Sequence, residues 1–168
     1  MGIRIVFALG IILGCTLFGK TMSGTLRRRV SVLNDLIRGV NLLRIHMCER
    51  LTCVQDALRS SGCQSFVCVG RKMESGFSAG EAWDLSKKVL LSRGGVLDSL
   101  SVDNLEVMNS LFDKMGEMNR QEQDVSLRST LDQLKKQYES ARVQLSERER
   151  LYISVGFLTG LMIALSVI

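Results

Sequence analysis

The sequence predicts an all-α protein, an antiparallel helical bundle of about five helices between an N-terminal and a C-terminal transmembrane helix. Three observations predict this fold class. The 168 residues include no proline and only 5% aromatic residues, which disfavours a sheet-rich domain. Apolar residues recur at helical three- and four-residue steps through the middle of the chain. Nearly all of the 22 basic and 17 acidic residues lie between two apolar end segments.

The first apolar segment, residues 1–24, is expected to be a transmembrane anchor. Its uncharged run from Ile5 to Gly19 would span roughly 22 Å as a helix, which is short of a ~30 Å hydrocarbon core unless Lys20 reaches outward. A cleaved signal peptide is the alternative. The run Ile12–Cys15 resembles a lipoprotein cleavage site, which would leave Cys15 lipidated.

The second apolar segment, residues 151–168, carries no charge and would span roughly 27 Å as a helix. Tyr152 follows Arg150, as an aromatic residue at a membrane interface does. Gly156 and Gly160 form a GxxxG pair, so they are candidates for transmembrane helix packing.

Positive charges orient the middle, residues 25–150. Arg27, Arg28 and Arg29 follow the first segment, and Arg148 and Arg150 precede the second. Because positive flanks stay inside, the middle is expected in the cytoplasm, where these arginines also face membrane lipid.

The middle divides into helices at turn residues. An apolar stripe from Leu26 to Leu58 predicts one helix of about 35 residues, ended by Ser60–Gly62. A shorter helical segment follows from Phe66 to Met73. Ser78 and Glu81 form a capping box that opens a helix reaching Leu91.

Ser101 is expected to cap the next helix, which Gly116 closes. The last helix starts near Asn119 and runs without punctuation for about 45 residues into the terminal segment. Its expected inner stripe consists of Val125, Leu127, Leu131, Leu134, Tyr138, Ala141 and Leu145.

Four cysteines form two evenly spaced pairs, Cys48 with Cys53 and Cys63 with Cys68. Free thiols are the expectation for a cytoplasmic domain, with a structural zinc site or disulfides as alternatives. Five residues on a helix turn by about 140°, which disfavours a zinc site formed by the first pair.

No catalytic, cofactor or metal site is predicted. His46 is the only histidine and lies within the first helical stripe, and no phosphate-binding loop is present. The compact basic cluster adjoins a membrane segment, so a nucleic-acid partner is not expected.

Three stretches carry a resemblance to a known family: Ala82–Trp83 after a Ser-rich turn, Met115–Gln123, and Val155–Leu161 near the C-terminus. In these stretches the sequence resembles the stage III sporulation protein AB family. Asn119 stands where that family usually has Asp.

The resemblance implies a non-enzymatic component of the channel complex in the mother cell membrane that faces the forespore. The family looks like the cytoplasmic domain of type II secretion inner-membrane platform proteins. The implied partners are a cytoplasmic secretion-type ATPase and other small membrane proteins of the same complex, in an assembly that is compatible with oligomers.

Two turns are the candidate partner-binding sites under this resemblance: one contains Glu81 and Trp83, and the other contains Gly116, Asn119 and Gln123. Each also has a structural interpretation, with Glu81 as a cap, Trp83 as core and Asn119 as an N-cap. An exported lipoprotein and a generic membrane-anchored helical scaffold are the alternative functions.

Overall fold

The computed structural model describes residues 24–115 and 118–167. Within these ranges the chain forms six α-helices and one π-helical turn, and no strand. The predicted all-helical class is therefore confirmed. Residues Arg29–Glu139 form one compact unit, and a second unit contains the start of the first described helix and the chain from Ser140 onward.

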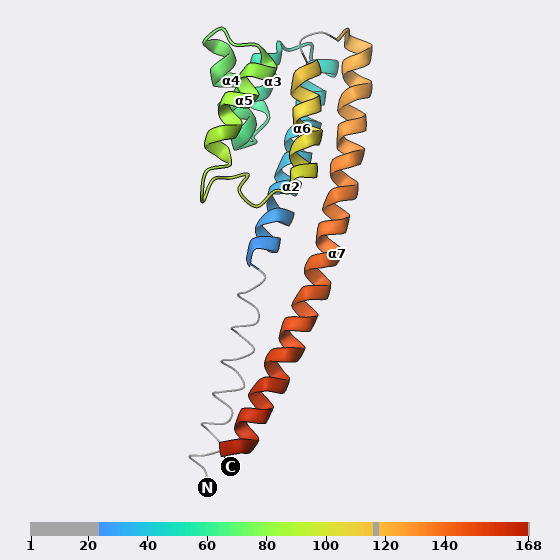
Figure 1. Ribbon diagram of the computed structural model, residues 1–168. Coiled ribbons are helices and arrows are strands. Elements are labelled where there is room, and N and C mark those ends of the chain that lie inside the picture. Colours follow the sequence, from blue (N-terminus) through green and yellow to red (C-terminus); the bar gives the residue numbers. More distant parts are fainter. Residues whose placement is uncertain (1–23, 116–117, 168) are drawn as a thin grey trace. The chain divides into compact units, whose positions relative to one another are not determined.

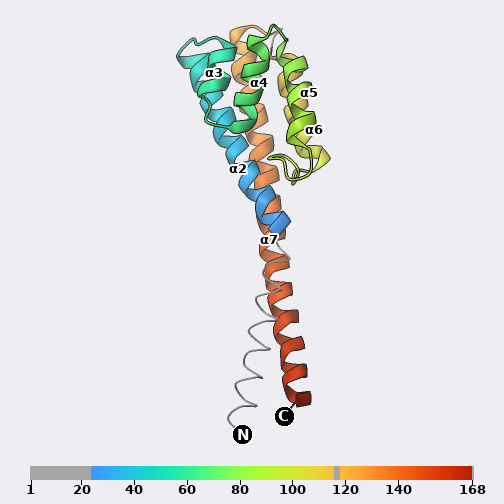
Figure 2. The same ribbon diagram turned by 90° about the vertical axis from the view of Figure 1, so that its left-hand side faces the viewer.

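The first described helix, α2, runs over Gly24–Arg44 and continues into a π-helical turn, η1, over Ile45–Glu49. The short helices α3 (Val54–Ser60) and α4 (Gln64–Glu74) follow, then α5 (Ala79–Leu90) and α6 (Val102–Lys114). Figures 1 and 2 show α3, α4 and α5 packed in sequence, with α6 beside α5. The last helix, α7, runs without interruption over Arg120–Val167.

The prediction of one uninterrupted helix from Leu26 to Leu58 is wrong, because the helix breaks between Glu49 and Val54. The backbone leaves the helix after Glu49, and Leu51 adopts a left-handed conformation with φ 60°. Leu51 is 64% exposed, so it does not belong to the inner stripe in which the periodicity placed it. Hydrophobic spacing continues across this break because α2 and α3 both pack on the same core.

Aromatic residues from three helices form the centre of the core. Trp83 of α5 stacks on Phe112 of α6 with ring centroids 4.7 Å apart, and Phe66 of α4 meets Phe112 edge-on at 5.7 Å. All three rings have no exposed surface. Leucines from α2 and α7 complete the interior, including Leu33, Leu36, Leu43, Leu127 and Leu134.

Side chains three residues apart start the later helices, as the sequence predicts. Ser78 and Glu81 form the expected capping box of α5, and the backbone N–H of Ser78 donates to Glu81 Oε2 at 3.0 Å. Ser101 caps α6 together with Asn104, whose Oδ1 accepts from the Ser101 backbone N–H at 3.1 Å. These local contacts fix where both helices begin.

Among the described residues, no helix is long and apolar enough to cross a membrane. The expected N-terminal anchor, residues 1–24, lies outside the described residues except for Gly24. The second expected anchor begins at residue 151 within α7, which is helical to Val167. At Gly156 and Gly160 only the helical backbone is described, so their packing stays a prediction.

Candidate functional site

The turn that joins α6 to α7 is the better defined of the two candidate partner sites. Asn119 and Glu122 cap α7 reciprocally: Asn119 N–H donates to Glu122 Oε2 at 3.1 Å, and Glu122 N–H donates to Asn119 Oδ1 at 3.0 Å. The interpretation of Asn119 as an N-cap is therefore confirmed. Gln123 holds the turn together, since its Nε2 donates to the carbonyls of Met115 and Met118. Gly116 lies outside the described residues.

The other candidate turn offers one exposed residue and one buried one. Glu81 is exposed, and the two hydrogen bonds from Ser78 lower the pKa of its carboxyl group. Trp83 has no exposed surface, and its Nε1 donates to Asn109 Oδ1 at 2.7 Å inside the bundle. Trp83 therefore has no surface for a direct partner contact, and it serves as core.

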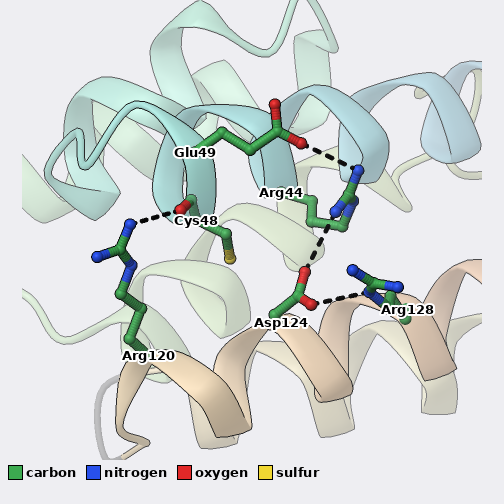
Figure 3. A network of polar contacts seen from close by, with 6 residues as sticks. All are labelled: Arg44, Cys48, Glu49, Arg120, Asp124 and Arg128. Atoms are coloured by element: carbon green, nitrogen blue, oxygen red, sulfur yellow. Dashed lines mark hydrogen bonds and ion pairs between the residues drawn. The ribbon is translucent and has the colours of Figure 1, made fainter.

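A polar network lies where η1 meets the first turns of α7 (Figure 3). Asp124 accepts from two arginines, from Arg44 Nη1 at 3.2 Å and from Arg128 Nε at 2.8 Å. Arg44 also pairs with Glu49 at 3.3 Å through Nη2. The half-buried Asp124 thus connects the end of α2 to α7.

Arg120 supports the π-helical turn from outside it. Its Nη2 donates to the backbone carbonyl of Cys48 at 2.6 Å (Figure 3). Such a donor satisfies a carbonyl that the end of a helix leaves without an intrahelical partner. Burial, and then the nearby Asp124 carboxylate, raise the pKa of the Cys48 thiol, so this sulfur stays protonated at neutral pH.

The network borders a hollow of about 1150 Å³ that follows the first turns of α7. Its walls come from α2 with η1, from α6 and from α7, and it is open to solvent. The apolar part of its lining includes Val107, Leu111 and Val125. Its size and openness suit a macromolecular partner better than an enclosed small molecule.

Val125 is a correction to the expected inner stripe of the last helix. It is 67% exposed, whereas Leu127 is 1% exposed. Residues two apart on a helix point in directions about 160° apart, so both cannot face one core. The exposed Val125 side chain therefore belongs to the wall of the hollow.

A second polar cluster, which sequence reasoning missed, joins α2, α6 and α7. Asn104 is fully buried, and its Oδ1 accepts from Arg29 Nε at 3.2 Å. Its Nδ2 donates to Gln137 Oε1 at 2.8 Å, while Arg29 Nη2 donates to Ser101 Oγ at 3.0 Å. One signal was available: Asn104 lies four residues before the buried Met108, on the apolar face of its helix.

The four described cysteines are unpaired: Cys63 is buried, Cys48 and Cys68 are half-buried, and Cys53 is exposed. The described residues also contain no group of three or more His, Cys, Asp or Glu side chains that could hold a metal ion. Free thiols stay the prediction for these cysteines, and counting them in the native protein tests it.

Comparison with known proteins identifies the family. No significant similarity to a curated protein or to a solved structure was found. The model of the family described as stage III sporulation protein AB matches residues 4–168, essentially the whole sequence. The chain therefore belongs to the stage III sporulation protein AB family and is a sporulation protein.

Proposed function

We propose that the chain is a non-enzymatic membrane component of the channel complex between mother cell and forespore. It would act as a type II secretion platform-like adaptor between that complex and a cytoplasmic secretion ATPase. The observation that carries the proposal is the continuity of α7, one helix over Arg120–Val167. Its first turns border the polar network and the hollow, and its last turns contain the uncharged segment from residue 151.

An ion pair supports the placement of both apolar segments against one membrane. Arg27 Nη2 lies 2.5 Å from Glu149 Oε1. In the sequence, Arg27 follows the first apolar segment closely, and Glu149 comes two residues before the second. An anchor at each end would then enter the membrane at the same level, with the arginines on the cytoplasmic side.

The adaptor role needs a stiff connection between the bundle and the membrane and a surface that binds the cytoplasmic partner. It needs no catalytic step. A single helix transmits position along its axis because every backbone hydrogen bond lies within it. The hollow beside its first turns is the surface that we assign to the cytoplasmic partner. The ATPase as that partner comes from the resemblance to secretion platform proteins.

Topology mapping tests the membrane part of this proposal. A reporter that is active only in the cytoplasm is inserted at Gly76, in the turn between α4 and α5, and in a second fusion after Ile168. Gly76 is exposed, and a Cβ atom added to it would have no neighbour within 4 Å, whereas the turn at Gly95 leaves no room beside the Leu90 carbonyl. Activity at Gly76 alone is the expected result.

A silent reporter at Gly76 would place the bundle outside the cytoplasm. That result would remove the ATPase as a partner and favour an exported lipoprotein modified at Cys15. Copurification of the full chain with the secretion-type ATPase from sporulating cells tests the second part. Cytoplasmic topology without that association would favour a generic membrane-anchored scaffold.

A further inference from the structure

The hollow beside α7, called the groove from here on, is lined by α2 with η1, by α6 and by α7. Leu111 of α6 forms part of its floor and is only 3% exposed. On α7, Gln121, Val125 and Ser129 recur every four residues and therefore lie on one helical face. The exposed Val125 side chain offers an apolar contact to a helix that enters the groove.

The charges around the groove are not balanced. Its carboxylates are already engaged: Asp124 accepts from Arg44 and Arg128, Glu49 accepts from Arg44, and Glu122 accepts from the Asn119 backbone. Among residues 24–115 and 118–167, Lys114 has no ion-pair partner.

Two further cations leave donors available to a partner. Arg120 donates to a backbone carbonyl and to no described carboxylate, while Arg128 uses only its Nε on Asp124. The groove also lies at the N-terminus of α7, where the helix dipole adds partial positive charge. Among the described residues that line the groove, four are basic (Arg44, Lys114, Arg120 and Arg128) and three are acidic (Glu49, Glu122 and Asp124), so the surplus is one positive charge.

We propose that this groove docks an acidic amphipathic helix of a partner protein. The apolar face of that helix would cover Val125 and the half-buried Val107, and its carboxylates would bind Lys114, Arg120 and the free guanidinium nitrogens of Arg128. The inference rests on the proposed function in taking a protein, and not a lipid surface, as the occupant. It adds the chemistry by which that protein is recognised.

Opposite charges at one exposed position test the proposal. Val125→Glu and Val125→Lys introduce side chains of similar length into the groove wall. The folded bundle tolerates either, because Val125 is exposed and the start of a helix slightly favours the glutamate. Folding stability therefore ranks the glutamate variant level with or above the lysine variant. Binding of an acidic partner ranks them in the opposite order, because lysine attracts the partner's carboxylates and glutamate repels them. A loss of binding can thus be told apart from a loss of folding.

For the measurement, a photo-crosslinking amino acid replaces Ser129, an exposed residue of the groove, in the full-length chain produced in sporulating cells. We expect a protein adduct that Val125→Lys preserves and that Val125→Glu reduces about tenfold or more. The matched controls are Val89→Glu and Val89→Lys on α5, where the valine is 70% exposed and lies outside the groove. Neither control should change the adduct yield.

Equal losses from the two Val125 variants, a greater loss from lysine, or no effect of either would overturn the proposal. The absence of any protein adduct at Ser129 would also overturn it, including the case in which the groove faces anionic lipid. Thermal unfolding of each variant checks the fold. Should Val125→Glu not accumulate, the pair Lys114→Gln and Arg128→Gln replaces it, with the same loss of adduct expected.

The failure of this inference is distinguishable from failure of the proposed function. A cytoplasmic Gly76 reporter and ATPase copurification, with adducts insensitive to charge at position 125, would reject only the acidic helix. A silent Gly76 reporter would reject the proposed function itself.

Discussion

The Asn104 side chain donates from Nδ2 to Gln137 Oε1 at 2.8 Å, which ties α6 to α7 inside the bundle. The same side chain accepts from Arg29 of α2, so one fully buried amide of α6 joins its own helix to two others. Buried polar groups of this kind favour one register of the helices over others that apolar packing would also allow.

Asn104→Leu is expected to lower the free energy of unfolding by about 1–3 kcal/mol. Leucine preserves the volume of the side chain. It leaves Arg29 Nε without its acceptor and Gln137 Oε1 without its donor. Urea denaturation measures the change. The control is Asn41→Leu at an exposed position of α2, expected within about 0.5 kcal/mol of wild type. An equally small effect at Asn104 would contradict a structural role for the cluster.

Asn119→Ala is expected to cost about 1 kcal/mol of stability through loss of the N-cap of α7. Asn119→Asp preserves the acceptor and should restore wild-type stability. Thermal unfolding of the three proteins provides the comparison. If the alanine variant were fully stable yet failed to assemble with its partners, the capping account would be the wrong one.

Gly39→Ala is expected to destabilise the bundle by about 1–3 kcal/mol, even though alanine is the better helix former. A Cβ atom at this position would lie 2.7 Å from Cys63 Cβ and 2.9 Å from Phe66 Cε2. Calorimetry of the variant checks the prediction. Gly24→Ala on the same helix serves as the control, since no atom lies within 4 Å of its added Cβ.

Leu51→Gly is expected to raise the free energy of unfolding by about 0.5–1 kcal/mol. Glycine adopts a φ of 60° without the steric cost of a side chain, and the exposed leucine gives up little buried surface. Leu51→Ala retains its Cβ atom and should bring no gain. Chemical denaturation that ranks alanine level with glycine would show that the left-handed conformation carries no strain.

The buried Cys63 thiol is expected to make stability fall at alkaline pH. Burial raises its pKa above the ordinary value of 9.0. Below that value the thiol is protonated in both folded and unfolded chains, and its contribution is complete. As the pH rises from 9 toward the folded-state pKa, the unfolded chain ionises first, so the contribution is lost.

Unfolding free energies measured from neutral pH to well above the ordinary thiol pKa of 9.0 test this prediction. Cys63→Ala should flatten the alkaline decline, whereas Cys53→Ala, at an exposed position, should leave it unchanged. In the same preparations, a thiol reagent at neutral pH should modify Cys53 well before Cys63. Identical pH profiles for the two variants would contradict the burial of Cys63.

Local signals in the sequence determined the helical class and the starts of three helices. Ser78 with Glu81, Ser101, and Asn119 act on backbone groups within three residues, so a capping site is visible without knowledge of the rest of the chain. The uninterrupted α7 was visible in the same way, because no glycine turn or proline divides residues 120 to 150.

Only the tertiary structure decided the break after Glu49 and the exposure of Val125. The Arg44 and Arg120 contacts that hold the break join residues 80 and 72 positions apart in the chain, and periodicity carries no information about such pairs. Whether an apolar residue is buried depends on whether another helix covers it, and none covers Val125 within the described part of the chain. The candidate groove follows from these two features: spacing along one chain specifies which face a residue occupies, and packing between distant segments specifies what that face meets.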